Sequence, residues 1–201
     1  MIHRIDYFIA ALIGFLTGVF AIPVALNLGI RERVLLLLLP LAVPPVFAFG
    51  VWLGKVLSRW LAFMTHLTKF AVVGFLNFAI DVGILNLLSI LTGIKAGFII
   101  GGVNIPGFVL AAFNSYFWNK FWVFQDRGDR SVWHDFPKFI SVTGAGLVIN
   151  SVVVIVVTTY VDPFFSFSPD AWLNIAKVLA AIVSLGWNFV GYKLFVFTPT
   201  P

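Results

Sequence analysis

Residues 70–91 read "FAVVGFLNFAIDVGILNLLSIL", an almost unbroken apolar run that contains a single acid, Asp81. A helix needs about 20 such residues to cross the roughly 30 Å of hydrocarbon in a bilayer. Because backbone polar groups in lipid must satisfy their own hydrogen bonds, a helix is favoured over any open sheet. The run therefore predicts a transmembrane helix with an ionisable side chain near the bilayer centre.

The rest of the chain has the same character. Of its 201 residues, 61% are hydrophobic and 10% are charged, which lies far outside the range of a soluble domain. Runs such as "VLLLLLP" lack the alternation of apolar and polar residues that a transmembrane β-strand shows. We therefore predict an all-α integral membrane protein with six transmembrane helices, at residues 7–28, 34–54, 70–91, 96–118, 139–161 and 171–192.

The distribution of the 13 Lys and Arg residues predicts the orientation, because cytoplasmic loops retain positive charge. If both termini are cytoplasmic, most of these residues face inward: Arg4, Lys55, Arg59, Lys69, Lys120, Arg127, Arg130, Lys138 and Lys193. We therefore expect a multi-pass protein of the cell (cytoplasmic) membrane with both termini inside.

Arg31 and Arg33 do not fit this pattern. Either they lie outside and are outweighed by the other basic residues, or the first two runs form a hairpin that does not cross the membrane fully. Pro40, Pro44 and Pro45 would favour an incomplete crossing. Since both runs are long enough to span, we expect the hairpin to cross fully.

An internal repeat divides the second part of the chain into two units. "KFAVVGFLNFAID" at 69–81 aligns with "KFISVTGAGLVIN" at 138–150, and "YFWNKFWVF" at 116–124 aligns with "FVGYKLFVF" at 189–197. Each unit contains two spans, so both copies enter the membrane from the same side and are parallel repeats. The predicted units are 69–124 and 138–197.

These motifs, in this order and at these separations, resemble the GtrA-like family, also described as the GtrA/DPMS transmembrane domain, over about 66–197. Its members are small bacterial and archaeal membrane proteins with four core helices, linked to cell-surface polysaccharide synthesis. The resemblance implies translocation, or flipping, of a polyprenyl-phosphate-linked sugar. The alternative is a non-transporting membrane anchor for a polyprenyl-phosphate glycosyltransferase. Residues 1–60 lie outside the resemblance and are expected to form an N-terminal transmembrane hairpin.

A polyprenyl-phosphate sugar offers a negative phosphate, a ring of hydroxyls and a long apolar tail. Its site therefore needs a cation, amides and a groove that faces lipid. We predict that phosphate binds at Lys120 and Lys193, which are equivalent in the two units, although both also fit the role of ordinary interfacial anchors. The full set of predicted substrate-binding residues is Asp81, Asn77, Asn114, Asn119, Lys120, Asn150, Lys177, Asn188 and Lys193.

Asp81 lies twelve residues after Lys69, which corresponds to about 18 Å along a helix. A lone carboxylate at that depth costs about 2.5–3.5 kcal/mol on insertion scales, so it should be neutral, paired or exposed to a wet cavity. Lys177 is the one basic residue well within the last run, and we hypothesise that it pairs with Asp81. The structural alternative is a hydrogen bond from Asp81 to a neighbouring helix through Asn77.

Other features are typical of membrane packing. We expect Trp118, Trp122, Phe121 and Phe124 to form an interfacial aromatic belt, and Lys69 and Lys138 to be interfacial anchors. The pairs Gly14 and Gly18, Gly50 and Gly54, and Gly97 and Gly101 each have the G-x-x-x-G spacing that permits close helix approach. "GGVNIPG" at 101–107 predicts a kink or an unwound turn in the wall of the lipid path.

Catalysis and cofactor binding find little support. The chain has no cysteine, and His3, His66 and His134 lack the H-x-x-x-H spacing of a metal site. We therefore predict a protein that is not an enzyme and that needs no metal or cofactor. Nucleic acid is not an expected partner, because the excess positive charge is spread along one membrane face. The expected partners are the lipid-linked sugar, membrane lipid and a glycosyltransferase, and the sequence leaves a homo-oligomer open.

Overall fold

The computed structural model describes residues 3–123, 132–163 and 166–191. In these ranges the chain forms six α-helices, and a π-helical segment, η1 (Asn119–Val123), follows the fourth. All six helices predicted from the apolar runs are confirmed, with small differences at their ends. They are α1 (Arg4–Asn27), α2 (Arg33–Leu57), α3 (Met64–Thr92), α4 (Ile99–Trp118), α5 (Val132–Tyr160) and α6 (Pro169–Gly191).

Five helical segments in the described part of the chain are long and apolar enough to cross a membrane, namely Arg4–Asn27, Arg33–Leu57, Met64–Thr92, Ile99–Val123 and Ile140–Tyr160. The protein is therefore a multi-pass integral membrane protein. α6 is not among these segments. A crossing by α6 stays a prediction.

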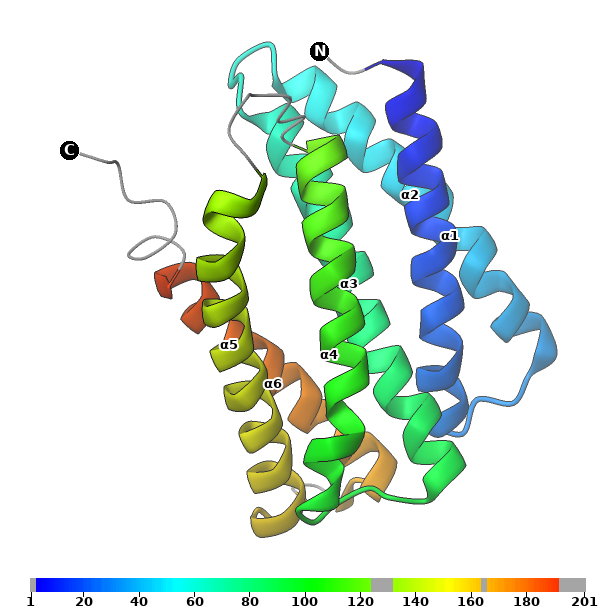
Figure 1. The fold of residues 1–201 in the computed structure, drawn as a ribbon. Coiled ribbons are helices and arrows are strands. Elements are labelled where there is room, and N and C mark those ends of the chain that lie inside the picture. The colour runs from blue at the N-terminus through cyan, green and yellow to red at the C-terminus, as the bar shows by residue number, and fades with distance from the viewer. Residues whose placement is uncertain (1–2, 124–131, 164–165, 192–201) are drawn as a thin grey trace.

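The helices form one bundle in which sequence neighbours pack together (Figure 1). α1 packs against both α2 and α3, α3 packs against α4, and α5 lies between α4 and α6. α1 and α3 begin, and α4 ends, at the end of the bundle that carries the N-terminus, which we call the near end. The loops 28–32 and 93–98 lie at the opposite end, the far end.

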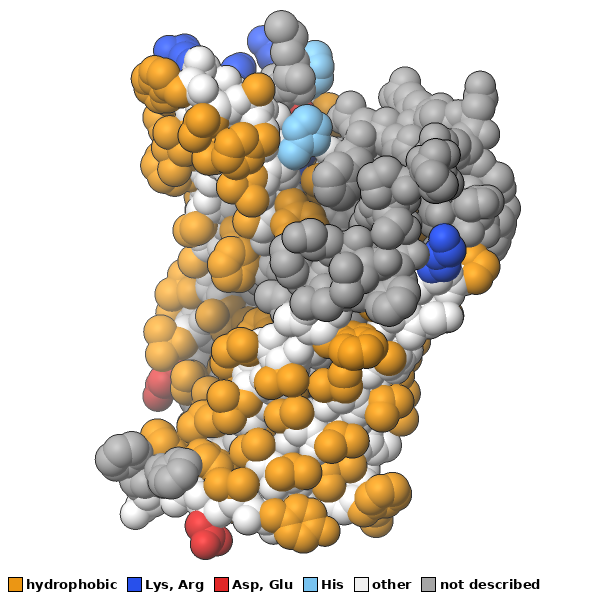
Figure 2. Space-filling model, turned by 90° about the vertical axis from the view of Figure 1, so that its left-hand side faces the viewer, with side chains coloured by type: hydrophobic (Ala, Val, Ile, Leu, Met, Phe, Trp, Pro, Cys, Tyr) orange, Lys and Arg blue, Asp and Glu red, His pale blue; other side chains and the backbone are white. Residues whose placement is uncertain are grey.

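The bundle surface is apolar. Figure 2 shows hydrophobic side chains over most of one face, with Lys, Arg and His side chains gathered toward its upper end. Leu37, Phe75 and Phe113 are each at least 60% exposed. So many exposed large apolar side chains would be unfavourable in water, whereas hydrocarbon solvates them.

Two glycines bring the first two helices into contact. A Cβ atom added at Gly14 would lie 2.8 Å from Pro44 Cα, and one added at Gly18 would overlap Pro40 Cα and the carbonyl oxygen of Leu39. The close packing predicted from the spacing of these glycines is confirmed. α2 continues without interruption through its three prolines, so they do not divide the hairpin.

Replacement of Gly18 by alanine is expected to destabilise the protein by about 1–3 kcal/mol, the usual cost of overpacking. The atoms that the new methyl group would meet are backbone atoms, so α1 and α2 would have to move apart. Thermal unfolding of the purified protein in detergent measures the effect. Gly50→Ala is the matched control, since a Cβ atom there meets nothing within 4 Å. Equal melting temperatures for the two variants would contradict close packing at Gly18.

The unwound turn predicted within "GGVNIPG" is wrong, because α4 continues as a helix through Pro106. Two of its glycines instead allow close packing of a neighbouring backbone and a neighbouring side chain. A Cβ atom at Gly107 would lie 2.6 Å from the carbonyl oxygen of Asp81, and one at Gly101 would lie 2.5 Å from Ile155 Cδ1. The departure from α-helical geometry comes later, at η1.

Candidate functional site

The hypothesised ion pair is confirmed. Lys177 Nζ, from α6, lies 2.6 Å from Asp81 Oδ1, from α3. The lysine is completely buried, and the aspartate is 6% exposed. A buried charge without a partner is expensive in a low-dielectric interior, so each group removes the main cost of burying the other.

Two amides complete the surroundings of the ammonium group. Lys177 Nζ donates hydrogen bonds to the side-chain oxygens of Asn104, from α4, and Asn150, from α5, the latter at 2.9 Å. Together with Asp81 these are three acceptors for the three N–H groups of the lysine. Each of the helices α3, α4, α5 and α6 thus contributes one side chain to a single point in the bundle.

Further polar groups extend this contact. Asn104 Nδ2 donates to Asn150 Oδ1 at 3.0 Å and to Ser151 Oγ at 3.1 Å. Asn150 Nδ2 donates to Ser184 Oγ at 3.2 Å. We call this set the central network, and its members are Asp81, Asn104, Asn150, Ser151, Lys177 and Ser184. It holds both the acceptors and the donors that sugar hydroxyls require, and its groups are paired with one another.

Asn77 and Asn114 lie apart from the central network. Asn114 Nδ2 donates to Asn77 Oδ1 at 2.6 Å, and Trp118 Nε1 donates to Asn114 Oδ1 at 3.0 Å. Asn77 therefore pairs with Asn114, and Asp81 pairs with Lys177. The alternative that linked Asp81 to a neighbouring helix through Asn77 is wrong. These two amides tie α3 to α4 one turn nearer to the near end.

Lys120 lies in η1, at the near end of α4. Its Nζ atom is 5.9 Å from the ring centroid of Tyr116 and 5.6 Å from that of Phe121, and the residue is half-buried. Asn119 donates to Ser115 Oγ at 3.1 Å. π-helical turns occur frequently at functional sites, and here the turn holds a cation against two aromatic faces.

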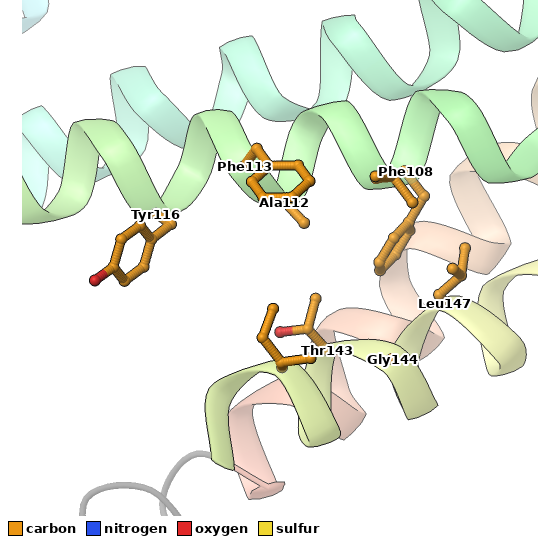
Figure 3. A pocket seen from close by; sticks show the side chains of 9 residues that line it. Phe108, Ala112, Phe113, Tyr116, Thr143, Gly144 and Leu147 are labelled. Atoms are coloured by element: carbon orange, nitrogen blue, oxygen red, sulfur yellow. The ribbon is translucent and has the colours of Figure 1, made fainter. Parts of the chain in front are cut away.

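An apolar groove opens between α4 and α5 (Figure 3). Its cavity is about 210 Å³, and Tyr116, whose ring contacts Lys120, is part of its wall. In the close-up, the labelled side chains of α4 and α5 face one another across the opening. The lining residues are Phe108, Val109, Ala112, Phe113, Tyr116, Ile140, Thr143, Gly144 and Leu147.

A second buried ion pair joins the N-terminal hairpin to α3 at the near end. Lys69 Nζ lies 2.6 Å from Asp6 Oδ1, and Trp122 Nε1 donates to the same oxygen at 2.9 Å. All three residues are at most 4% exposed. The expectations that Lys69 is an interfacial anchor and that Trp122 belongs to an interfacial belt are therefore wrong, because α1 covers both residues.

Two predicted site residues fall outside what the structure describes. Lys193 lies beyond residue 191, and the side chain of Asn188, although its backbone belongs to α6, is not described. Sequence reasoning also left Asn104, Ser151 and Ser184 out of the site. Ser184 follows Lys177 by seven residues and therefore shares its helix face, which is a signal that could have found it.

Comparison with known proteins gives one match. The model of the family described as GtrA/DPMS, transmembrane domain, matches residues 69–197, which is more than half of the chain. α1 and α2 lie outside this match, whereas the central network and the groove lie within it. No curated protein and no solved structure matches the chain.

Proposed function

Because the chain belongs to the GtrA/DPMS transmembrane domain family, we propose that it moves a polyprenyl-phosphate-linked sugar across the membrane. The family is associated with cell-surface polysaccharide synthesis and is generally non-catalytic. The observation that carries the proposal is the central network, in which a buried ion pair and two amides from four helices meet inside an apolar bundle. A membrane anchor has no need for such costly polarity, whereas a carrier of a polar head group does.

The α4–α5 groove and Lys120 support the assignment of the lipid part of the substrate. A prenyl tail needs an apolar surface that faces lipid, and the groove between α4 and α5 offers one. A phosphate needs a cation, and Lys120 contacts the ring of Tyr116, which lines the groove. In this arrangement the phosphate binds Lys120 while the tail lies along the groove.

The sugar would then meet the central network. On α4, Asn104 lies one turn beyond Phe108 of the groove, and on α5, Ser151 lies one turn beyond Leu147. The network therefore continues the line of the groove toward the far end. Sugar hydroxyls can both donate and accept, so they can replace the contacts that Asn104 and Ser151 make with each other.

The network is closed in this structure, since its ammonium group contacts the carboxylate and both amides, and the two amides contact each other. A head group can enter only when α4 moves away from α5. Separation of these two helices breaks the hydrogen bonds from Asn104 to Asn150 and Ser151. Sugar hydroxyls would restore the lost contacts, so the network stabilises the closed form without a substrate and offers binding groups to one.

The two-unit arrangement and the orientation are part of the proposal. Asp81 and Asn150 align in the two repeats, and both contact Lys177. The first repeat therefore has a carboxylate and the second an amide at the same aligned position. This difference lies where an asymmetric head group would pass. The distribution of Lys and Arg residues supports cytoplasmic termini, which would make the near end the cytoplasmic side.

Transbilayer movement of a polyprenyl-phosphate sugar in liposomes that contain only the purified protein tests this function. Movement is measured as loss of protection from an external reagent that modifies the head group. We expect movement above that of protein-free liposomes. No movement with several different head groups, together with a glycosyltransferase that co-purifies with the protein, would refute transport and leave the anchoring role.

Lys120→Ala is expected to slow this movement about tenfold. A hydrogen bond to a charged group contributes about 1.5–3 kcal/mol, and a loss of 1.4 kcal/mol corresponds to a factor of ten. Lys55→Ala is the matched control, because Lys55 is an exposed lysine in the last turn of α2, at the same end of the bundle. Equal rates in the two variants would remove Lys120 from the site.

A further inference from the structure

A second cavity, of about 500 Å³, lies at the far end of the bundle. The end of α1 and the loop that follows it form one side, and the end of α3 and the α3–α4 loop form the other. Asp170, in the first turn of α6, completes the wall. The cavity therefore lies between the N-terminal hairpin and the family-matched part of the chain.

Two basic side chains from different elements line this cavity. Arg31 comes from the α1–α2 loop and is exposed, and Lys95 comes from the α3–α4 loop. Lys95 Nζ lies 2.7 Å from Asp170 Oδ1, and the two side chains are 36% and 19% exposed. The three charges sum to one net positive charge, so the cavity favours an anion. Asp170 compensates Lys95, whereas no described ion pair compensates Arg31.

Hydrogen-bonded amides, with the buried Asn86 between two half-buried ones, fix the geometry of this cavity. Asn27, which also lines it, donates from Nδ2 to Asn86 Oδ1 at 2.7 Å, and Asn86 donates to Asn174 Oδ1 at 2.8 Å. This chain of hydrogen bonds ties the end of α1 to α3 and α6. Arg31 follows Asn27 by four residues, in the loop that starts at this tied end of α1.

We propose that this cavity binds the phosphate group of a lipid, held between Arg31 and Lys95, on the side of the membrane opposite to Lys120. The identity of that lipid as a prenyl phosphate rests on the proposed function. In the structure Asp170 accepts from Lys95, and an incoming phosphate replaces this carboxylate. Since Arg31 lies outside the family match, the N-terminal hairpin completes a site that the family domain alone would leave with one cation.

A divalent cation fits the cavity less well. Asp170, the one acidic side chain among the described lining residues, is already paired with Lys95. In the described part of the chain, no group of three or more His, Cys, Asp or Glu side chains is placed to hold a metal ion. Guanidinium and ammonium groups are the usual partners of phosphate, and here one of each lines the cavity, each from a different loop.

Titration of the full-length protein in nanodiscs of zwitterionic lipid tests the proposal. The probes are farnesyl phosphate, as a short prenyl phosphate, and inorganic phosphate in a separate titration. All variants carry Lys120→Ala, so that binding by the Lys120 ammonium group does not contribute. We expect Arg31→Gln to weaken farnesyl phosphate binding about tenfold. Asp170→Asn should tighten it, because the variant removes the carboxylate that competes for Lys95.

Arg33→Gln is the matched control, because Arg33 is an exposed arginine two residues from Arg31 that does not line the cavity. Equal weakening by Arg31→Gln and Arg33→Gln would overturn the proposal, as would weaker binding in Asp170→Asn. Inorganic phosphate that binds as tightly as farnesyl phosphate would overturn the lipid assignment. If farnesyl phosphate binds in this cavity but the protein moves no lipid-linked sugar, the proposed function is refuted and the cavity is still a phosphate site.

Discussion

Lys177→Met is expected to destabilise the protein by about 3–5 kcal/mol, the usual cost of removing one partner from a buried ion pair. Methionine fills a similar volume but donates no hydrogen bond. The substitution would leave Asp81 as a buried carboxylate without its cation, and Asn104 and Asn150 without their shared donor. Thermal unfolding in detergent should therefore show a large drop in melting temperature.

A second substitution identifies the cause. Addition of Asp81→Asn removes the uncompensated charge, so the double variant should regain a substantial part of the lost stability. Lys138→Met is the matched control, since Lys138 is an exposed lysine on α5, and it should unfold near the wild-type temperature. A double variant less stable than Lys177→Met alone would show that the two residues contribute independently and not as a pair.

Asp6→Ala is expected to have an effect of similar size, about 3–5 kcal/mol, at the near end. The substitution would leave the buried ammonium of Lys69 without its carboxylate and the indole N–H of Trp122 without its acceptor. Because Asp6 belongs to α1 and its partners to α3 and η1, the hairpin should loosen from the core. Limited proteolysis of the purified protein should then cut between the hairpin and α3 faster than in the wild type.

Asp162→Ala makes the same chemical change at an exposed position after α5 and serves as the control. It should alter neither the melting temperature nor the proteolysis rate. If Asp6→Ala unfolds at the wild-type temperature, the Asp6–Lys69 contact contributes little, and the apolar contacts of α1 with α3 hold the hairpin in place.

Local sequence properties explain why the helices could be predicted. Span length and hydropathy depend on residues close together in the chain, so α1 to α6 follow from the apolar runs. The Asp81–Lys177 pair could also be predicted, because an intramembrane acid needs a cation and Lys177 was the one basic residue well within the last run.

Contacts made by the hairpin could not be predicted in the same way. Lys69 and Trp122 look like interfacial residues when only their own segments are considered. Asp6, which pairs with both, lies 116 positions from Trp122 in the chain. Only the packing of α1 over α3 and η1 brings these groups together, and no local pattern indicates that packing.

Asn104 and the surrounding glycines were misinterpreted for a related reason. Pro106 within a glycine-rich segment suggested an irregular backbone, but α4 stays helical and uses Gly107 to approach the backbone of Asp81. That approach brings Asn104 to Lys177. Glycines occur both where two helices pack closely and where a helix is broken. The glycines of this segment belong to the first case, and the sequence pattern alone does not distinguish the two.

Polar side chains lie at three levels along the bundle. Lys120 stands at the near end, the central network lies between α3, α4, α5 and α6, and Arg31 and Lys95 line the cavity at the far end. The proposed path of a head group joins these levels in that order. Its critical step is the separation of α4 from α5 at the central network.

A disulfide that locks α4 to α5 tests this step most directly. A Cβ atom at Gly101 would lie 4.0 Å from Ser151 Cβ, within the roughly 3.5–4.5 Å of a disulfide, and the native chain has no cysteine. The measurement is transbilayer movement of a polyprenyl-phosphate sugar by Gly101→Cys/Ser151→Cys in liposomes, oxidised and then reduced. Each single variant, treated identically, is the control. We predict that oxidation stops movement in the double variant only and that reduction restores it. Equal movement in the oxidised and reduced protein would contradict passage between α4 and α5.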